Sequence, residues 1–336
     1  MMSNSVIVIA EVGVNHNGSI EQAKRLVEIA SVAGADYVKF QSFQADLLAS
    51  PQADLATYQK ESSVNFDSQL AMLKEYELSD EDHVLLKEFC LEKDIGYLSS
   101  AFDQVSLDFL RSQGLKSFKV PSGEITNYPY LKLLGSFNAE IFLSTGMSTM
   151  HEISDAVEVL IAAGTDKKKI TVLHCNTQYP TELEDANLRA IQTIERELCI
   201  RVGYSDHTRG SVASIIAVSL GASVIEKHIT LNSSQAGPDH KASMEPTEFI
   251  KYVRGIREAE IALGDGIKRV TNSERDNRLL VRKSLVAAVD ISEGDTFSSE
   301  NIAVKRPGTG ISPMKINSVL GLKANRNFRK NEPIQV

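Results

Sequence analysis

A repeated alternation of strand-like and helix-like segments limits the fold of this chain more than any other feature of its sequence. Short runs rich in β-branched and aromatic residues occur at 6–10, 37–41, 96–100, 117–120, 140–144, 170–174, 200–204 and 223–228. A helix-like amphipathic stretch follows each run, and the first stretch can be capped by Ser19 and ended by Gly34. Eight such units in about 265 residues predict a (β/α)8 TIM barrel. A doubly wound open sheet is the alternative, but no GxGxxG motif follows the first run.

The length of the chain predicts a second, smaller domain, because one hydrophobic core stops growing near about 250–300 residues and this chain has 336. We expect the barrel at 1–266, a polar linker at 267–281, and a small domain at 282–336, where short strands and turn residues replace the βα pattern. The polar segment 48–69 is expected to form an extended loop over the barrel mouth, before a helix that begins near Ser79.

Thirty-six basic and 44 acidic side chains give a net charge of −8, which argues against a nucleic-acid partner and requires a local positive pocket for any acidic substrate. No apolar run approaches the ~18 residues of a membrane span and no signal-peptide pattern is visible, so we expect no membrane association and a cytoplasmic protein. Cys90, Cys175 and Cys199 form no CxxC pair and are expected to be reduced, buried and structural. His83 and His151 are expected at the surface.

Polar side chains gather at the predicted carboxyl ends of the strands, where barrel enzymes place their chemistry. Lys39 and Lys119 lie inside predicted strands, and a buried lysine is unfavourable unless it meets an anion. Together with the hydroxyls of Ser122, Ser144 and Thr145, the lysines predict a site for phosphate and carboxylate groups. The alternative is that one lysine points outward between the helices.

His207 and His228 close two neighbouring predicted strands and could offer two imidazole nitrogens to one divalent cation. Because structural zinc sites normally have four protein ligands, such a cation would be exchangeable and completed by water, substrate or a carboxylate such as Glu11. Two ordinary hydrogen-bonded histidines are the alternative. Asp206 is a candidate to orient an imidazole, and His16 is expected either to donate to substrate or to cap a turn.

Nine segments, in order along nearly the whole chain, resemble those of bacterial sialic acid synthases, a phosphoenolpyruvate-condensing family. The segments are AEVGVNHNGS (10–19), VKFQSF (38–43), KVPSGE (119–124), LSTGM (143–147), HCNTQYPT (174–181), GYSDHT (203–208), EKHITL (226–231), GPDHKASMEP (237–246) and VKRPGTGISP (304–313). The resemblance implies a TIM barrel followed by a small antifreeze-like (SAF) domain of the β-clip type. It also implies a domain-swapped homodimer, in which the small domain of one chain covers the active site of the other.

The resemblance implies roles for individual residues. His207 and His228 match ligands of Mn²⁺, or of another divalent cation such as Mg²⁺ or Co²⁺. Residues in segments that hold phosphoenolpyruvate or line the pocket are Lys39, Lys119, Ser122, Ser144 and Tyr179, and Ser205 is a further candidate. Residues that match positions around the sugar acceptor are Glu11, Gln41, Glu226 and Asp239, with Arg306 delivered from the partner's small domain, to the acceptor's acyl group. Cys175-Asn176-Thr177 departs from the family pattern, which leaves either Asn176 or Thr177 as the phosphate contact.

The implied reaction is a metal-dependent condensation of phosphoenolpyruvate with an open-chain N-acyl hexosamine and water, with C–O cleavage and release of phosphate. The expected acceptor is N-acetylmannosamine, which gives N-acetylneuraminate; the alternative is 2,4-diacetamido-2,4,6-trideoxymannose, which gives N,N'-diacetyllegionaminate. Glu11 and Glu124 are the candidate general bases. Two rival hypotheses are a Schiff-base aldolase with Lys39 or Lys119 as nucleophile, and a non-enzymatic scaffold whose small domain is a binding module.

Overall fold

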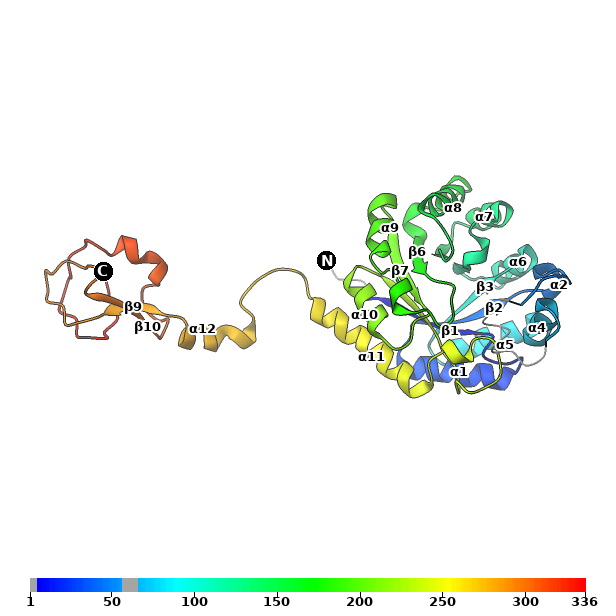
Figure 1. The fold of residues 1–336 in the computed structure, drawn as a ribbon, viewed down its shortest axis with the longest axis horizontal. Helices are drawn as coiled ribbons and strands as arrows, with labels where there is room; N and C mark the ends of the chain where they lie inside the picture. The colour runs from blue at the N-terminus through cyan, green and yellow to red at the C-terminus, as the bar shows by residue number, and fades with distance from the viewer. Residues whose placement is uncertain (1–4, 56–65) are drawn as a thin grey trace. The chain divides into compact units, whose positions relative to one another are not determined.

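The computed structural model describes residues 5–55 and 66–336, and its larger part is a closed barrel of parallel strands (Figure 1). The strands follow one another around the barrel in chain order, and the last pairs with the first, so that Glu11 lies beside His228. They are β1 (Ile7–Gly13), β2 (Tyr37–Ser42), β3 (Gly96–Ala101), β4 (Ser117–Val120), β5 (Glu140–Ser144), β6 (Ile170–Cys175), β7 (Arg201–Asp206) and β8 (Val224–His228). Each predicted run forms one strand, and the prediction of a TIM barrel is confirmed.

Helices surround the barrel and connect its strands (Figure 1). They are α1 (Ile20–Ala33), α5 (Asp80–Glu92), α6 (Gln104–Ser112), α7 (Tyr128–Gly135), α8 (Met150–Ala162), α9 (Ala190–Leu198), α10 (Val212–Ser219) and α11 (Pro246–Leu263). In α1, the Ser19 side chain accepts a hydrogen bond from the Gln22 backbone N–H, and Gly34 ends the helix with a φ of 79°, a left-handed conformation that favours glycine. The predicted caps of this helix are therefore the observed ones.

In the described part of the long connection between β2 and β3, two helices precede α5: α2 (Ala45–Leu48) and α4 (Gln69–Tyr76). The extended loop expected at 48–69 therefore gives way to a helix at its end, and residues 56–65 of that segment lie outside the described part of the chain. Apolar side chains pack α2 and α4 against the end of the barrel; they include Val14, Phe43, Ala45, Met72, Leu73 and Tyr76. Ser79 begins α5 as predicted, with a capping box to Asp82.

Inside the barrel, an apolar floor lies beneath a layer of polar side chains. The apolar floor consists of Ile9, Leu98, Phe142, Leu173 and Val224. Because side chains two residues apart on a strand face the same side, the next inward positions on these strands are Glu11, Ser100, Ser144, Cys175 and Glu226. Gly203 of β7 lets the floor close, since a Cβ there would lie 2.5 Å from the Leu173 side chain. The strands thus carry their polar groups to the carboxyl end of a sealed barrel.

The chain divides into two compact units, Met1–Gly264 and Asp265–Val336. The second unit contains α12 (Arg275–Val281) and an antiparallel pair, β9 (Ser284–Ala287) and β10 (Ile302–Lys305). Its own apolar core includes Leu285, Ala287, Phe297, Val319 and Phe328. The Gly308 backbone N–H donates to the Leu279 carbonyl, so α12 contacts the rest of this unit. The domain limits given by the sequence, at 266, 267, 281 and 282, stay predictions.

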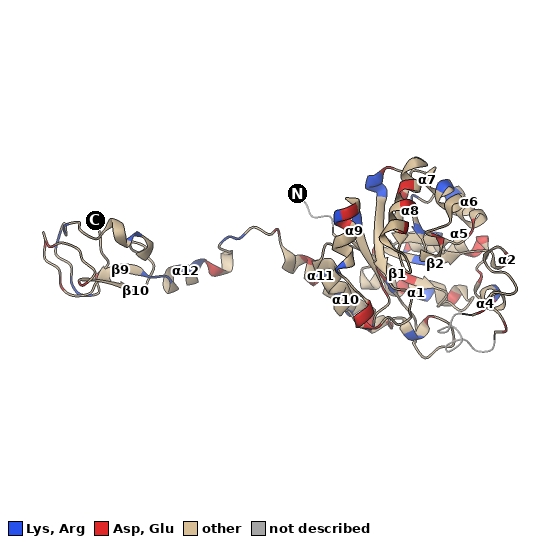
Figure 2. Cartoon of the chain, turned by 45° about the horizontal axis from the view of Figure 1, so that its top comes forward, with Lys and Arg blue, Asp and Glu red and all other residues tan. Residues whose placement is uncertain are grey.

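Charges of both signs are interspersed over the helices of the barrel (Figure 2). None of the helices in the described part of the chain is long and apolar enough to cross a membrane. Cys90 and Cys175 are buried as predicted, but the prediction for Cys199 is wrong: it follows the last turn of α9 in a left-handed conformation and is exposed.

The expectation for His83 is also wrong, whereas His151 is exposed as predicted. His83 is only 3% exposed, and its ring lies within hydrogen-bond distance of the Ser42 hydroxyl (3.2 Å) and the Tyr97 hydroxyl (2.8 Å). It stands three residues before Leu86 on α5, on the buried face of the helix.

Candidate active site

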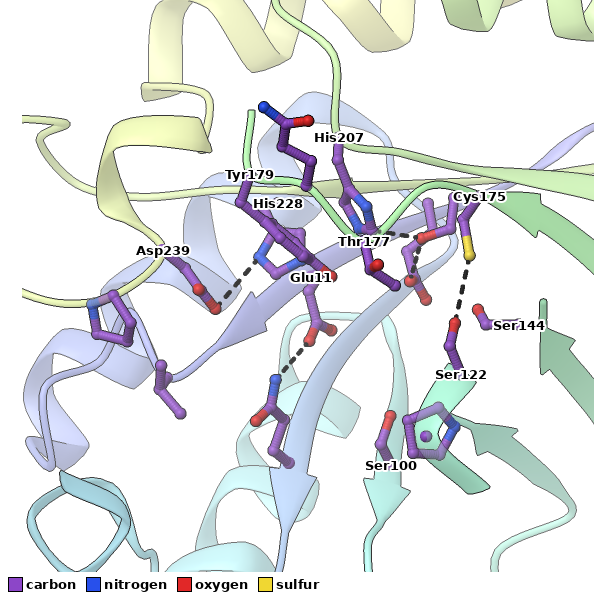
Figure 3. Close-up of a pocket in the computed structure, with 18 of the residues that line it drawn as sticks. Glu11, Ser100, Ser122, Ser144, Cys175, Thr177, Tyr179, His207, His228 and Asp239 are labelled. Carbon is purple, nitrogen blue, oxygen red and sulfur yellow. Dashed lines mark hydrogen bonds and ion pairs between the residues drawn. The ribbon is translucent and has the colours of Figure 1, made fainter. Parts of the chain in front are cut away.

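The carboxyl ends of the strands surround a cavity of about 1010 Å³ (Figure 3). The predicted site residues that line it are Glu11, Lys39, Gln41, Lys119, Ser122, Ser144, Thr177, Tyr179, Ser205, His207, Glu226, His228 and Asp239. Glu124 and Asn176 are described residues of the barrel unit that do not line it, and Arg306 belongs to the second unit. A volume at the upper end of the usual range for ligand pockets gives room for two small substrates.

Two lysines and two glutamates form a buried charged cluster within this cavity: Glu11, Lys39, Lys119 and Glu226. Lys39 Nζ lies 2.8 Å from Glu11 Oε2 and 3.7 Å from Glu226 Oε2, and Lys119 Nζ lies 3.6 Å from Glu226 Oε1. Both lysines point into the barrel, so the alternative that one points outward is wrong. When all four groups are ionised the charged cluster has no net charge, and the anions that the lysines meet in the free protein are the chain's own carboxylates.

The two carboxyl groups of the charged cluster differ in acidity. Burial raises the pKa of Glu11 to about 7, against the opposing effect of Lys39. Burial also acts to raise the pKa of Glu226, but the charges of Lys119 and Lys39 outweigh it and lower this pKa to about 2. Because neighbouring carboxyl groups with separated pKa values commonly divide acid and base roles, Glu11 is the group suited to proton transfer and Glu226 the permanent anion.

His207 and His228 face each other beside the charged cluster, with ring centroids 5.3 Å apart. His207 Nδ1 donates a hydrogen bond to the Asn176 carbonyl, which leaves a lone pair on Nε2. His228 Nδ1 is buried without a hydrogen-bond partner and lies 3.8 Å from Asp239 Oδ2. Burial lowers the pKa of His207 to about 4 and that of His228 well below its ordinary value, so both rings are neutral, the form that binds metals.

These two rings fit a cation that substrate and water help to coordinate. Within residues 5–55 and 66–336, no three or more His, Cys, Asp or Glu side chains are grouped closely enough to hold a metal ion by themselves. A closed structural site is therefore absent from this part of the chain. The unpartnered nitrogen of His228 and the neutral state of both rings suit an open site with exchangeable ligands.

The β6 loop brings Tyr179 and Thr177 into the cavity and turns Asn176 away from it. The Tyr179 ring lies 4.1 Å from the ring of His207 and 5.5 Å from that of His228 (centroid distances), so it covers the histidine pair. The Asn176 side chain accepts a hydrogen bond from the Gln178 backbone N–H. Of the two candidates left open by the sequence, Thr177 is thus the one with access to a ligand in the cavity.

One end of the cavity is rich in hydroxyl groups, and Figure 3 shows it on the opposite side of Glu11 from Asp239. Ser100 accepts a hydrogen bond from Lys39 Nζ (3.0 Å), and Ser122 accepts one from the Gly146 backbone N–H (2.9 Å). Ser144 Oγ is buried without a hydrogen-bond partner. Thr145, expected in the anion site, instead donates its hydroxyl to the Leu173 carbonyl. The hydroxyl-rich end therefore holds an unused buried donor in Ser144.

At the other end of the cavity, Gln41 and Asp239 meet around Gly13. Gln41 Nε2 donates to Glu11 Oε1 (3.3 Å), and burial raises the pKa of Asp239 to about 6. A Cβ on Gly13 would lie 3.2 Å from Gln41 Nε2 and 3.6 Å from Asp239 Oδ2. The absence of a side chain at Gly13, whose φ is 54°, keeps these two polar groups close together.

Asp206 does not orient an imidazole as expected; it forms a buried ion pair on the outer side of the barrel wall. Its Oδ2 lies 3.2 Å from Lys227 Nζ, and the carboxylate accepts hydrogen bonds from the Thr208 N–H, the Thr208 hydroxyl and the Ser214 hydroxyl. Lys227 Nζ also donates to the Thr208 carbonyl. Asp206 precedes His207 and therefore faces the opposite side of β7. The pair joins the ends of β7 and β8.

Three further predicted residues lie apart from the cavity lining. Glu124 is partly exposed and accepts a hydrogen bond from the Asn127 side chain, which removes the geometric support for a general base there. His16 is buried, and its Nδ1 accepts a hydrogen bond from the Gly18 backbone N–H, so of its two possible roles it caps a turn. Arg306 is exposed in the second unit.

Several lining residues gave no signal in the sequence. Val14, Met72, Leu73 and Tyr76 have the spacing and polarity of ordinary core residues, yet they line the cavity. Arg209 also lines it, and its position two residues after His207 could have marked it.

A TIM barrel with neutral imidazoles and a charged cluster at its strand ends defines an enzyme of the barrel class. A family model of the NeuB family matches residues 26–268, and one of the SAF domain matches residues 282–335. The chain therefore belongs to the NeuB family of sialic acid synthases, and the predicted SAF domain is confirmed.

Similar proteins agree with this assignment. The chain is 48% identical over 329 residues to N,N'-diacetyllegionaminic acid synthase of Campylobacter jejuni, covering 98% of each chain. It is 43% identical over 328 residues to N,N'-diacetyllegionaminic acid synthase of Legionella pneumophila, covering 97% of this chain and 92% of the relative. The solved structure of N-acetylneuraminic acid synthetase from Leptospira borgpetersenii, in complex with citrate, has 31% identity and a TM-score of 0.73, over 82% of this chain and 90% of that one.

Proposed function

We propose that this enzyme condenses phosphoenolpyruvate with 2,4-diacetamido-2,4,6-trideoxymannose and water, to give N,N'-diacetyllegionaminate and phosphate. Two relatives with that name, at 48% and 43% identity, favour this acceptor over N-acetylmannosamine, the acceptor first expected. The observation that carries the chemistry is the convergence of two neutral imidazoles and the charged cluster in one cavity.

His207 and His228 would hold the divalent cation, Mn²⁺ or a related ion. When bound, the cation supplies Lewis-acid polarisation of the acceptor's aldehyde. His207 is fixed for this role by its hydrogen bond to the Asn176 carbonyl, and Tyr179 restricts the access of water to both rings.

The hydroxyl-rich end would bind the donor. Lys39 and Lys119 exchange part of their pairing with the glutamates for the carboxylate and phosphate of phosphoenolpyruvate. Ser122, Ser144 and Thr177 line the same end, and Ser144 contributes the donor that has no partner in the free protein. A trianionic ligand suits this end because two buried cations and several hydroxyl groups lie within reach of it.

The reaction joins C3 of phosphoenolpyruvate to C1 of the open-chain sugar. The C1=O double bond opens, its oxygen takes up a proton to become a hydroxyl, and positive charge develops at C2. Glu226, held ionised by two lysines and by the Ser205 hydroxyl (2.8 Å), stabilises that charge. Water adds to C2 and loses its proton to Glu11. The tetrahedral intermediate then collapses with cleavage of the C2–O bond, and phosphate leaves with the bridging oxygen. Gln41 and Asp239 orient the acceptor.

A phosphate-release assay with phosphoenolpyruvate and the trideoxy acceptor tests this proposal. We expect turnover that a chelator abolishes and Mn²⁺ restores. The turnover of the His207→Ala variant should be lower by a factor of about 100 or more. His151→Ala, at an exposed histidine, is the matched control and keeps full activity. When the oxygen that bridges C2 and phosphorus in phosphoenolpyruvate is labelled with ¹⁸O, the label should appear in the released phosphate, because the C2–O bond is cleaved. Chelator-resistant activity together with a borohydride-trapped adduct would instead support the Schiff-base aldolase.

We also propose the domain-swapped homodimer, with Arg306 of one chain acting on the acceptor bound by the other. The exposure of Arg306 and its place outside the barrel unit are compatible with this role. Mixing inactive Arg306→Ala and inactive His228→Ala subunits should then restore activity in sites that combine the two intact parts. Verified heterodimers without recovered activity would exclude action in trans.

A further inference from the structure

The end of the cavity that contains Gln41 and Asp239 is called the acceptor end. It has one apolar side, which the proposed chemistry leaves without a role. We call it the apolar wall; it consists of Val14, Leu48, Met72, Leu73 and Tyr76. Met72 is 3% exposed and Leu73 is 9% exposed. Four of the five residues come from α2 and α4, the helices in the long β2–β3 connection. This connection therefore contributes to the ligand site as well as packing on the barrel.

The apolar wall lies beside the acceptor end of the cavity. Val14 directly follows Gly13, around which Gln41 and Asp239 meet. The turn that follows Gly13 also touches α4, since a Cβ on Gly18 would lie 2.9 Å from the Glu75 carbonyl. Burial raises the pKa of Tyr76, and the charges of Glu75 and then Asp239 add to this effect, as expected for neighbours. The apolar wall and the Asp239 carboxylate thus border the same space.

The reaction fixes which part of the sugar can reach this wall. C1 must lie at the charged cluster and the histidine pair, because it forms the new bond there. The opposite end of an open-chain hexose is C6, and it points away from the reacting atoms. Against Val14 and Leu73, whose side chains carry no polar atom, a hydroxyl on C6 would lose its water without gaining a hydrogen-bond partner, whereas a methyl group would gain burial.

On this basis we propose that the apolar wall binds the terminal methyl group of a 6-deoxy acceptor and selects it over 6-hydroxy sugars, with Met72 and Leu73 as specificity-determining residues. The inference rests on the proposed function, because it takes an open-chain amino sugar as the acceptor. It assigns the choice between deoxy and hydroxy sugars to α4, a helix of the β2–β3 connection.

Four acceptors test the inference on the unmodified enzyme with Mn²⁺ present. They are 2-acetamido- and 2,4-diacetamido-mannose derivatives, each prepared with a hydroxyl and with a hydrogen on C6. We expect the 6-deoxy member of each pair to have a kcat/KM about 10- to 100-fold higher, the discrimination that an apolar pocket achieves against an added hydroxyl. The KM for phosphoenolpyruvate should be the same within each pair. A preference that follows only the C4 substituent would overturn the inference.

Substitutions on α4 then assign the preference to the wall. Leu73→Asn should reduce the C6 preference at least fivefold, mainly by lowering kcat/KM for the 6-deoxy sugars. Leu70→Asn is the matched control, since Leu70 lies on the same helix and packs in the same apolar cluster without lining the cavity; it should keep the preference. Met72→Gln conserves side-chain length and serves if Leu73→Asn does not fold. An equal loss in the control and in both wall variants would contradict a local role.

The outcomes separate this inference from the proposed function. If no acceptor releases phosphate from phosphoenolpyruvate, the proposed function fails. If all four acceptors react with similar kcat/KM, the proposed chemistry stands and the role of the apolar wall is refuted.

Discussion

Lys227→Met removes the cation from a carboxylate that is almost completely buried. The side chains of Lys227 and Asp206 are 1% and 0% exposed, and the two groups lie 3.2 Å apart between the ends of β7 and β8. Methionine fills a similar volume, so the main change is that Asp206 keeps its charge without a counter-ion. The substitution therefore isolates an electrostatic effect in a well-packed part of the barrel.

Removing one partner of a buried ion pair typically costs about 3–5 kcal/mol of unfolding free energy. Hydrogen bonds from Thr208 and Ser214 continue to stabilise the Asp206 carboxylate, which places the expected loss near the lower limit, about 3 kcal/mol. For a domain of this size, each kcal/mol lowers the Tm by roughly 2–4 °C. The Tm of the Lys227→Met variant should therefore be lower by about 6–12 °C.

Urea and thermal unfolding of the full chain, followed by circular dichroism, measure this loss. Lys227→Met should be destabilised, while the double variant Asp206→Asn/Lys227→Met should recover about 1 kcal/mol or more, because the uncompensated charge is gone. Arg254→Met is the control, since Arg254 forms an exposed pair with Glu258 and its loss should cost at most about 0.5 kcal/mol. If Lys227→Met behaves like Arg254→Met, or the double variant is less stable than the single one, the reasoning is refuted.

Two further predictions concern stability. Burial lowers the pKa of His83 to about 4 from 6.5; the unfolded chain therefore binds this proton first, stability falls as the pH drops from about 6.5 to 4, and His83→Gln should show a shallower decline in urea midpoint over that range. An unchanged slope would contradict the linkage. Gly135→Ala should cost about 1–3 kcal/mol, because its Cβ would lie 2.6 Å from the Ala163 Cβ where α7 meets α8, whereas Gly255→Ala, with its nearest contact at 3.7 Å, should not destabilise the chain in the same unfolding measurement.

The barrel could be predicted because its strands and helices carry their burial pattern locally. Runs such as 140–144 alternate inward and outward side chains, and caps such as Ser19 and Gly34 mark helix ends in the sequence itself. Because side chains alternate between the two faces of a strand, the directions of Lys39 and Glu226 can be predicted once the strands are known. It also assigns Asp206 to the outer face of β7, since it stands between two inward residues, and our expectation for it neglected this.

The apolar wall could not be predicted for a physical reason. Met72 and Leu73 have the sequence pattern of a helix face packed on a core, and only the position of α4 at the cavity shows that a ligand can reach them. His83 is a different case, because its spacing from Leu86 and Cys90 places it on the buried side of α5. The pairing of Lys39 and Lys119 with carboxylates depends on side chains from β1 and β8, which are far apart along the chain.

The apolar floor closes the barrel at the end opposite the cavity. Ile9, Leu98, Phe142, Leu173 and Val224 fill its lower cross-section, so reactants and products exchange through the rim formed by the strand ends. Substrates that enter and products that leave use the same opening. A ligand bound near this opening therefore blocks the exit of a ligand bound deeper in the barrel. Under the proposed function, α2 and α4 lie at the open end of the barrel, so the segments proposed to select the acceptor also border the route by which the product leaves.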